Sequence, residues 1–178
     1  IGRFLKGKPR DKIFLATKAG WDFYPAGSKT FPWGAEIPGK DHRAVHRKNF
    51  DPAHLRFACE QSLKRLGVGT IDLYQLHNPS SEQIRRGEAV GALERLKKEG
   101  KIRFIGISVH TEAEALAALD DPRVEALQVI FNLLDRRMKA KVFPEASRKR
   151  VGVLAREPLA SGLLTGKYAP DHEFTKND

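Results

Sequence analysis

Two basic side chains stand at the ends of apolar runs, and their chemical types indicate proton transfer. Lys18 follows the run 13–16 after Thr17, and His77 closes the run 71–76. In a parallel α/β barrel the carboxyl ends of the strands carry the chemistry, because the loops there gather side chains from several strands around one pocket. An amine and an imidazole at such a rim predict a proton-transfer site.

Strands and helices alternate along the chain that must position these two residues. Asp51 can cap a helix with Pro52 at its first position, and Gly67 can end it. Hydrophobic periodicity defines the other segments. We predict strands over 13–18, 71–77, 102–108, 126–131 and 151–155, and helices over 52–66, 82–98, 112–119 and 139–148.

This alternation predicts right-handed βαβ units and a parallel sheet with its helices outside. An open doubly wound sheet and a barrel both fit, but no strand runs into a G-x-G-x-x-G turn, which disfavours a dinucleotide-binding open sheet. We therefore predict an α/β fold of the (β/α)8 TIM-barrel type. An eight-stranded barrel typically needs about 250 residues, so residues 1–178 are expected to form one incomplete barrel domain.

The composition limits the classes of partner. The chain carries a net charge of +10, with basic clusters at 43–48 and 136–150, yet no nucleic-acid-binding signature accompanies the charge. We predict no nucleic-acid partner, and an anionic small ligand explains the charge as well. The apolar stretches are of strand length, and residues 1–10 lack the apolar core of a leader, so we predict no membrane association and a cytoplasmic location.

The cysteine and histidine residues argue against a nucleophilic cysteine and against a metal site. Cys59 is the only cysteine, and its place in a helical pattern favours a packed thiol over a nucleophile. His42 and His46 have i, i+4 spacing, but they lie among basic residues and no third ligand is evident. We predict no metal site.

Five motifs in order resemble the aldo-keto reductases, and they cover nearly the whole chain. They are IFLATK at 13–18, SLKRLG at 62–67 leading into IDLYQLH at 71–77, GKIRFIGIS at 100–108, QVIFNL at 128–133 and PLASGLLTGKY at 158–168. The resemblance implies an NADPH-dependent reductase of small carbonyl compounds on a (β/α)8 barrel. The motifs run from the third barrel strand to just beyond the seventh.

In that family an aspartate, a tyrosine, a lysine and a histidine surround the substrate carbonyl. Lys18 and His77 match two of them, whereas the aspartate and the tyrosine belong upstream of Ile1. A tyrosine is a weak acid at neutral pH unless a cation stabilises its phenolate, and Lys18 would be that cation. His77 would orient the carbonyl. These 178 residues alone are therefore expected to be inactive.

The resemblance also implies cofactor contacts. Ser108 and Gln128 match the partners of the nicotinamide carboxamide, and Val109 stands where the family often has asparagine. Arg156 occupies the place of an aromatic residue that stacks on the nicotinamide, and a planar guanidinium can stack similarly. The segment expected to cradle the pyrophosphate contains Pro158, Leu159, Ser161 and Gly162.

The long segment 19–50 concentrates aromatic residues beside Lys18. We predict that Trp21 and Trp33 line the substrate pocket. Tyr24 is rejected as the proton donor, because a tyrosine on a long loop lacks the rigid placement that proton transfer needs.

Two other classes of function stay open beside the reductase. One is a non-catalytic protein of the same fold, like the auxiliary subunits of potassium channels, and the other is a basic binding module. Retention of both Lys18 and His77 favours the NADP(H)-dependent enzyme. The sequence leaves the oligomeric state and the particular carbonyl substrate undetermined.

Overall fold

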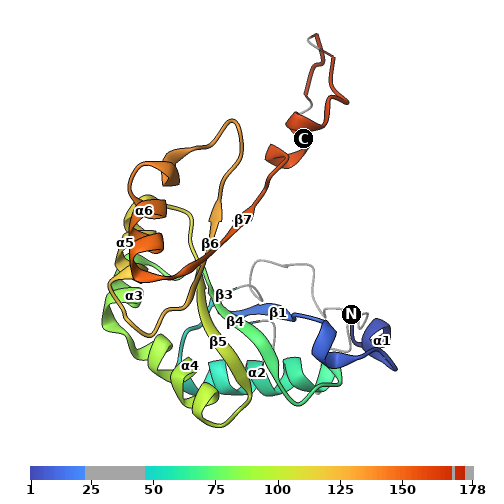
Figure 1. The fold of residues 1–178 in the computed structure, drawn as a ribbon, viewed down its shortest axis with the longest axis vertical. Coiled ribbons are helices and arrows are strands. Elements are labelled where there is room, and N and C mark those ends of the chain that lie inside the picture. Colours follow the sequence, from blue (N-terminus) through green and yellow to red (C-terminus); the bar gives the residue numbers. More distant parts are fainter. Residues whose placement is uncertain (23–46, 170, 175–178) are drawn as a thin grey trace.

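A computed structural model describes residues 1–22, 47–169 and 171–174, and its centre is a parallel sheet. The order of its five strands is β1-β4-β5-β6-β7 (Figure 1). Their bounds are Ala16–Ala19 for β1, Ile71–His77 for β4, Ile102–Ser108 for β5, Ala126–Ile130 for β6 and Gly152–Arg156 for β7. All neighbouring pairs are parallel, as the predicted βαβ units require. A short antiparallel ribbon of β2 (Trp21–Asp22) and β3 (Arg47–Lys48) lies beside it.

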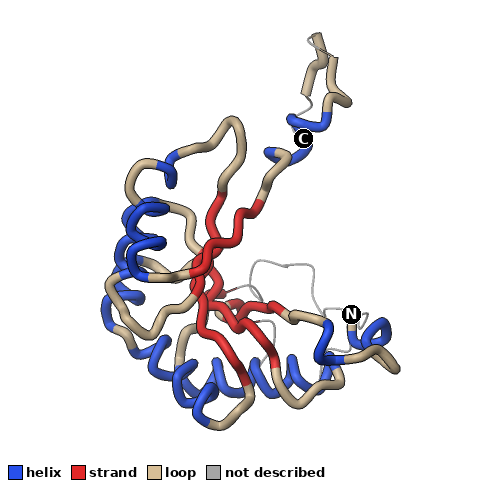
Figure 2. Tube along the Cα trace, viewed as in Figure 1, coloured by secondary structure: helices blue, strands red, loops and turns tan. Residues whose placement is uncertain are grey.

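The helices that follow the strands cover one face of this sheet. They are α2 Pro52–Leu66, α3 Ser81–Arg86, α4 Glu88–Lys98, α5 Glu112–Leu119 and α6 Val142–Lys149, whereas α1 Gly2–Leu5 precedes β1 and contacts α2. Figure 2 shows α2 to α6 along the outer side of a curved sheet, with the strands on the inner side. The segment after β7 extends away from the sheet. Helices outside a curved parallel sheet are the arrangement of a (β/α)8 barrel.

The strand register separates two sets of side chains. Successive residues of a strand point to opposite faces, and directly paired residues of neighbouring strands share a face. Leu76, Ile107 and Leu127 point to the helices and are fully buried, so they form the core between sheet and helices. The other set faces the inner side of the curve and includes both predicted catalytic residues, Lys18 and His77.

The predicted helix over 82–98 is wrong in one respect, because it is two helices. Gly87 adopts a left-handed conformation with φ of 69° and separates α3 from α4. Arg123 donates from Nη2 to the Gly87 carbonyl at 3.2 Å, and a Cβ on Gly87 would meet that nitrogen at 2.9 Å. A contact between residues 36 positions apart therefore stabilises the break.

Other boundaries differ by a few residues. The first strand begins at Ala16 rather than at residue 13, because the N–H of Leu15 donates to the carboxylate of Asp72 at 2.8 Å instead of joining a ladder. The last helix begins at Val142, since residues 137–139 form a separate 3-10 turn. Helices α2 and α5 agree with the prediction, and Asp51 caps α2 by accepting from the N–H of Ala53 and His54.

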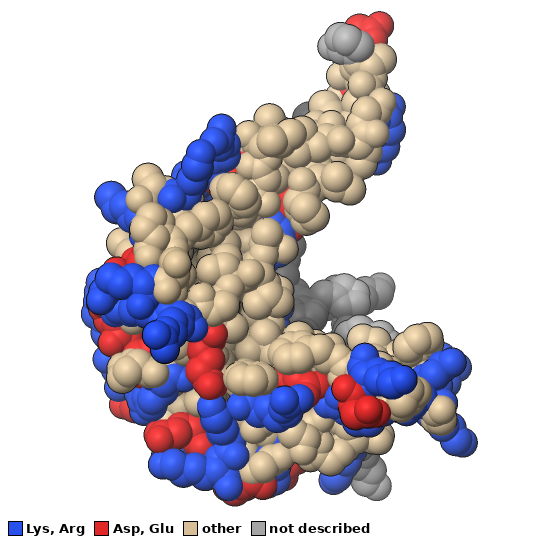
Figure 3. Space-filling model, in the orientation of Figure 1, with Lys and Arg blue, Asp and Glu red and all other residues tan. Residues whose placement is uncertain are grey.

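Charged residues follow the helices more than the inner face. In the view of Figure 3, Lys and Arg gather over the outer helices and the amino-terminal segment, interspersed with Asp and Glu. The hollow of the curve shows mostly uncharged atoms in this view. A positive charge near the inner face is therefore a local feature of the candidate site.

Candidate functional site

The carboxyl ends of the strands bring together polar residues from all five strands of the sheet. Lys18 pairs with Gln75, and His77 pairs with Ser108, which in turn pairs with Gln128. Because paired residues share a face, these side chains form one continuous row on the inner side of the sheet. Arg156 lies on β7 two positions beyond Leu154, the partner of Gln128, and so continues the row.

Several buried polar atoms of this row have no hydrogen-bond partner among the described residues. They are Oε1 of Gln75, Oγ of Ser108, Oε1 of Gln128 and Nε of Arg156, and Oδ1 of Asn78 lies just beyond β4. Buried polar groups are nearly always hydrogen-bonded in folded proteins, because an unpaired one costs about 1–3 kcal/mol. Five such atoms at one end of one sheet indicate a site that is completed by a ligand or by further chain.

The packing inside the row is tight and depends on a glycine. A Cβ on Gly106 would stand 2.8 Å from Cγ of Gln75 and 3.0 Å from Cδ1 of Leu73. Gly106 therefore leaves room for the Gln75 side chain beside Lys18. Gln75 is buried, and the sequence analysis did not single it out. Its spacing of two residues from His77 was the signal, since such residues share a face of a strand.

His77 is held neutral by its surroundings. Burial, together with the nearby charges of Lys18, Lys48 and Arg156, lowers the pKa of its imidazole to about 4. At neutral pH the ring therefore has one N–H donor and one lone pair. The ring of Trp21 lies edge-on to it, with the centroids 6.1 Å apart.

Lys18 shares this electropositive environment. Burial lowers the pKa of its ammonium group, and Arg156 acts in the same direction. No hydrogen bond or ion pair of Lys18 is found in the described part of the chain. Its charge is therefore available to a group that enters the site, and its proton is held less tightly than that of an exposed lysine.

Lys48 fixes the backbone that follows His77, a role that the sequence analysis missed. Its Nζ donates to the carbonyl oxygens of His77 at 2.8 Å and Asn78 at 2.5 Å. The same ammonium group lies 4.8 Å from the ring centroid of Trp21. Lys48 thus joins the ribbon β2–β3 to the end of β4. In the sequence, Lys48 is only a member of the basic cluster 43–48, because a bond to residues 77 and 78 cannot be inferred from the local sequence.

Arg156 is held from two directions at the end of β7. Its Nη2 lies 2.8 Å from Nδ1 of His110, in the segment between β5 and α5, and its Nη1 lies 2.5 Å from Oε1 of Glu157. The guanidinium group is therefore fixed by two different segments. His110 is a second residue that the sequence analysis did not select.

The segment after β7 has an unusual backbone where the pyrophosphate cradle is expected. Glu157, Ala160 and Ser161 adopt positive φ of 56°, 47° and 55°, and Gly162 has φ of 100°. Left-handed backbone is uncommon for non-glycine residues and clusters at functional segments. The side chain of Asn132 donates to the carbonyl oxygen of Glu157 at 2.9 Å and helps to hold this segment. Pro158 and Leu159 lie in the same turn.

Other expectations fall partly outside the described residues. Trp33, Tyr24, His42 and His46 lie in the segment 23–46, outside the described residues. In the described ranges, no group of three or more metal-binding side chains is found, and no helix has the length and apolar character needed to cross a membrane. Cys59 is fully buried and burial raises its pKa to about 11, which agrees with a packed thiol.

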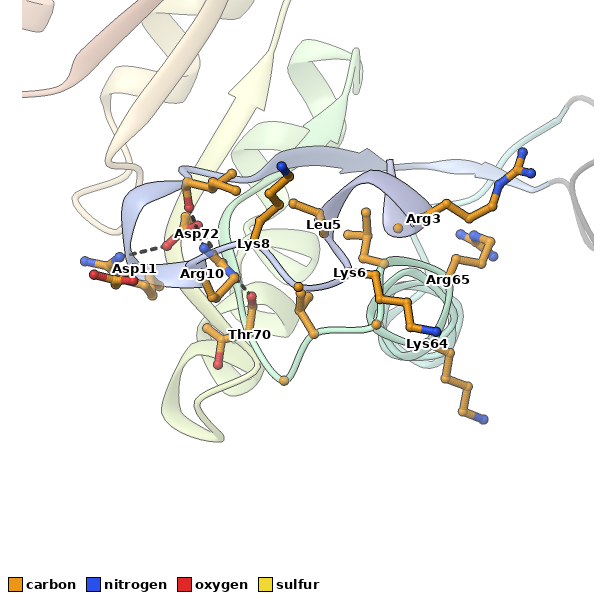
Figure 4. A pocket seen from close by; sticks show the side chains of 18 of the residues that line it. Arg3, Leu5, Lys6, Lys8, Arg10, Asp11, Lys64, Arg65, Thr70 and Asp72 are labelled. Carbon is orange, nitrogen blue, oxygen red and sulfur yellow. Dashed lines mark hydrogen bonds and ion pairs between the residues drawn. The ribbon is translucent and has the colours of Figure 1, made fainter.

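The opposite, amino-terminal end of the strands has a cleft of about 1340 Å³. It is formed by segments 2–13, 64–72 and 100–103, with many basic side chains (Figure 4). Its one buried carboxylate, Asp72, accepts from Arg10 Nη2 at 2.6 Å, Leu15 N at 2.8 Å and Arg103 Nη1 at 2.7 Å. The buried carboxylate of this cleft is already paired. We place the candidate site at the other end of the sheet.

The fold and this row of residues define a class of protein, namely a segment of a parallel α/β barrel with a polar site at the carboxyl ends of its strands. The family model for the aldo/keto reductase family matches residues 1–178. The chain is 32% identical over 167 residues to a probable aldo-keto reductase of Glycine max, covering 94% of this chain and 43% of that protein.

Solved structures give the same result. The holo form of an aldo-keto reductase from Bacillus halodurans superposes with a TM-score of 0.78 at 32% identity, covering 99% of this chain and 53% of that one. An aldo/keto reductase from Klebsiella pneumoniae in complex with NADP and acetate has a TM-score of 0.67 at 27% identity, covering 93% and 50%. The chain belongs to the aldo/keto reductase family, and it spans about half the length of these relatives.

Proposed function

We propose that this chain is the central and carboxyl-terminal part of an NADP(H)-dependent oxidoreductase that reduces an aldehyde or ketone to an alcohol. The observation that carries the proposal is the row on the inner face. An available lysine and a neutral histidine lie beside buried polar atoms that have no partner in the described residues. Family membership supports the reaction class, and the NADP-bound neighbour supports the cofactor.

In this proposal the two basic residues have different tasks. His77, neutral because its pKa is about 4, donates a hydrogen bond from one ring nitrogen to the carbonyl oxygen and orients it. Lys18 contributes positive charge beside the proton donor, which the family supplies from a tyrosine. Burial lowers the pKa of Lys18, so its proton is held less tightly than that of an exposed lysine.

The polar atoms without partners fit a nicotinamide cofactor. Ser108 and Gln128 would bind the carboxamide, because a hydroxyl and an amide oxygen can meet its N–H and carbonyl groups. Arg156 would lie against the ring. NADP(H), when bound, supplies the hydride. Pro158, Leu159, Ser161 and Gly162 would hold the pyrophosphate, since left-handed backbone in succession turns N–H groups toward an anion.

Trp21 is the proposed substrate-side wall, because its ring lies beside His77. Trp33 is also proposed to line the substrate pocket, and this proposal rests on the sequence alone. The chemistry of the site favours a small carbonyl compound as partner. Cytoplasmic location and the single-domain reading of residues 1–178 likewise stay predictions.

The alternative is a non-catalytic member of the family that binds NADP(H) without turnover. An assay of the full-length protein separates the two. The enzyme is expected to consume NADPH in the presence of a reactive aldehyde such as a nitrobenzaldehyde and to release the alcohol. Quenching of tryptophan fluorescence by NADPH without any alcohol product would support the binding protein instead. Absence of both signals would overturn the proposal.

The residues 1–178 by themselves are proposed to be inactive. The sheet ends in two open edges at β1 and β7 in the described structure, and unpaired edges favour association of strands. The tyrosine donor of the family is also not supplied by the row described above. A polypeptide of these residues that melts cooperatively as a monomer and turns over NADPH would contradict this expectation.

A further inference from the structure

The contact between Arg156 and His110 defines the chemical state of the histidine. Every nitrogen of a guanidinium group is a donor and none accepts a hydrogen bond. At 2.8 Å from Nη2 of Arg156, Nδ1 of His110 must therefore carry a lone pair. The imidazole is then neutral, with its proton on Nε2.

His110 is itself held by the cap of the following helix. Its backbone N–H donates to Oε2 of Glu114 at 2.9 Å. Glu114 also accepts from the N–H of Thr111 at 3.0 Å, and Thr111 Oγ1 accepts from the N–H of Glu114 at 3.2 Å. This capping box starts α5, so the imidazole projects from a backbone that is fixed by a helix rather than from a free loop.

We propose that His110 is a positioning residue of the cofactor site, which holds the guanidinium of Arg156 in the plane that the nicotinamide ring contacts. This inference rests on the proposed function of the site. Arg156 has a long side chain with many rotamers, and a contact that orders it before binding removes part of the cost of ordering it on binding. Glu157 holds the other end of the guanidinium, but it is adjacent in sequence and moves with Arg156.

The contact needs the lone pair of Nδ1, so it exists only while that nitrogen carries no proton. Histidine is the side chain that ordinarily changes charge between about pH 5 and 8. A proton on Nδ1 would replace the acceptor by a donor and place a second positive charge against Arg156. The charged or titratable groups around this contact include Arg156, which bonds the ring, Glu114 of α5, which accepts the backbone N–H of His110, Glu157, which pairs with Arg156, and His77 of β4, on whose pKa His110 acts.

The test compares NADPH binding by the full-length wild type, His110→Asn and His110→Phe, measured by fluorescence quenching at about pH 8 and about pH 5.5. Asparagine can offer an acceptor oxygen near the position of Nδ1 but does not titrate, whereas phenylalanine fills the space without an acceptor. At the higher pH we expect His110→Phe to bind about tenfold more weakly and His110→Asn within about twofold of the wild type. At the lower pH the wild type should lose more affinity than His110→Asn does.

Two results would overturn the inference. One is an affinity of His110→Phe equal to that of the wild type, and the other is an acid-induced loss in His110→Asn as large as that of the wild type. If His110→Phe fails to fold, as judged by its thermal melting curve, the pH comparison with His110→Asn decides alone. A wild type that binds no NADPH at either pH would instead contradict the proposed function itself.

Discussion

The two ends of the parallel sheet treat buried polar groups in opposite ways. At the amino end, both oxygens of Asp72 are paired with two arginines and a backbone N–H, and burial is outweighed by these bonds so that its pKa lies below the usual value. At the carboxyl end, Ser108, Gln128 and Gln75 have buried oxygen atoms without partners in the described chain. The comparison teaches that satisfied polar groups mark a structural end and unsatisfied ones a functional end.

Judged by cavity volume alone, the functional site would be placed at the amino end of the sheet. The cleft of about 1340 Å³ lies at the amino end, where basic side chains line an open groove. Figure 4 shows Arg10 directed at Asp72 and Thr70, so this arginine of the groove serves the fold. Because the buried carboxylate of this basic groove is already paired, the unsatisfied row at the carboxyl end is the better candidate for the reactive end.

The largest expected effect is that of Lys18→Met in the full-length protein. Turnover should fall by about a hundredfold or more, because the substitution removes charge and proton-transfer capacity that act mainly in the transition state. NADPH affinity should stay within about twofold. Steady-state kinetics and fluorescence titration measure the two quantities.

Lys98→Met is the matched control for that variant, because Lys98 is exposed on α4 and pairs with Glu94 at 3.0 Å. It should leave turnover unchanged. If Lys18→Met kept more than about half of the wild-type rate, the functional reading of the carboxyl end would be wrong.

The sequence predicted the five strands, and the position of Lys18 and His77 at the ends of two of them, because both depend on local signals. Asp51, Pro52 and Gly67 give the bounds of α2, and alternation gives the inner face that holds Lys18 and His77. What it missed depends on distant contacts: the break at Gly87 needs Arg123. Likewise, the shortened first strand follows from a bond to Asp72.

The same reason explains the missed site residues. Lys48 and His110 act through bonds to residues 29 and 46 positions away, on other elements. Gln75 is different, because its spacing of two residues from His77 already indicated in the sequence that both side chains lie on the same face of the strand. The catalytic assignments themselves stay predictions, because they came from resemblance and no ligand accompanies them.

The second largest effect is expected at the structural end. Asp72→Asn should lower the free energy of unfolding by about 2 kcal/mol, a reduced value because Arg10 and Arg103 are partly exposed and screened by solvent. NADPH affinity should not change. Chemical denaturation monitored by circular dichroism measures the stability.

Asp120→Asn is the control for this variant, because Asp120 is 83% exposed and its ion pair to Lys149 is long at 3.5 Å. Asp120→Asn should leave the free energy of unfolding unchanged. Asp72 has a lowered pKa, so its contribution is present above its ordinary pKa of about 3.9 and is lost as the pH falls below it. An Asp72→Asn variant that is as stable as the wild type at neutral pH would show that the amino end is not the structural one.

A smaller effect is expected for one of the unsatisfied atoms. Gln128→Ala should weaken NADPH binding by about 1–2 kcal/mol, roughly five- to thirtyfold, because it removes one hydrogen bond and leaves its partner on the cofactor unpaired. Stability should not fall, since Oε1 of Gln128 has no partner in the described chain. Fluorescence titration and a melting curve measure both, with Gln61→Ala on α2 as control. Unchanged affinity together with lost stability would reverse the assignment of Gln128.

The last prediction sharpens the comparison through pH. His77 has a pKa of about 4 in the folded protein, below the ordinary value of 6.5. Between these two values the unfolded chain binds a proton at this imidazole that the folded chain does not bind, so stability must decrease as the pH falls from 6.5 to 4. Asp72 changes the free energy of unfolding only below that pH range. The contributions of the two ends of the sheet to stability can therefore be measured at different pH values. His77→Gln, which does not titrate, should lose this part of the slope when unfolding is followed by urea titration at several pH values. An identical slope in the variant and the wild type would mean that His77 is solvated like an ordinary surface histidine, and the electropositive row would no longer explain its neutral state.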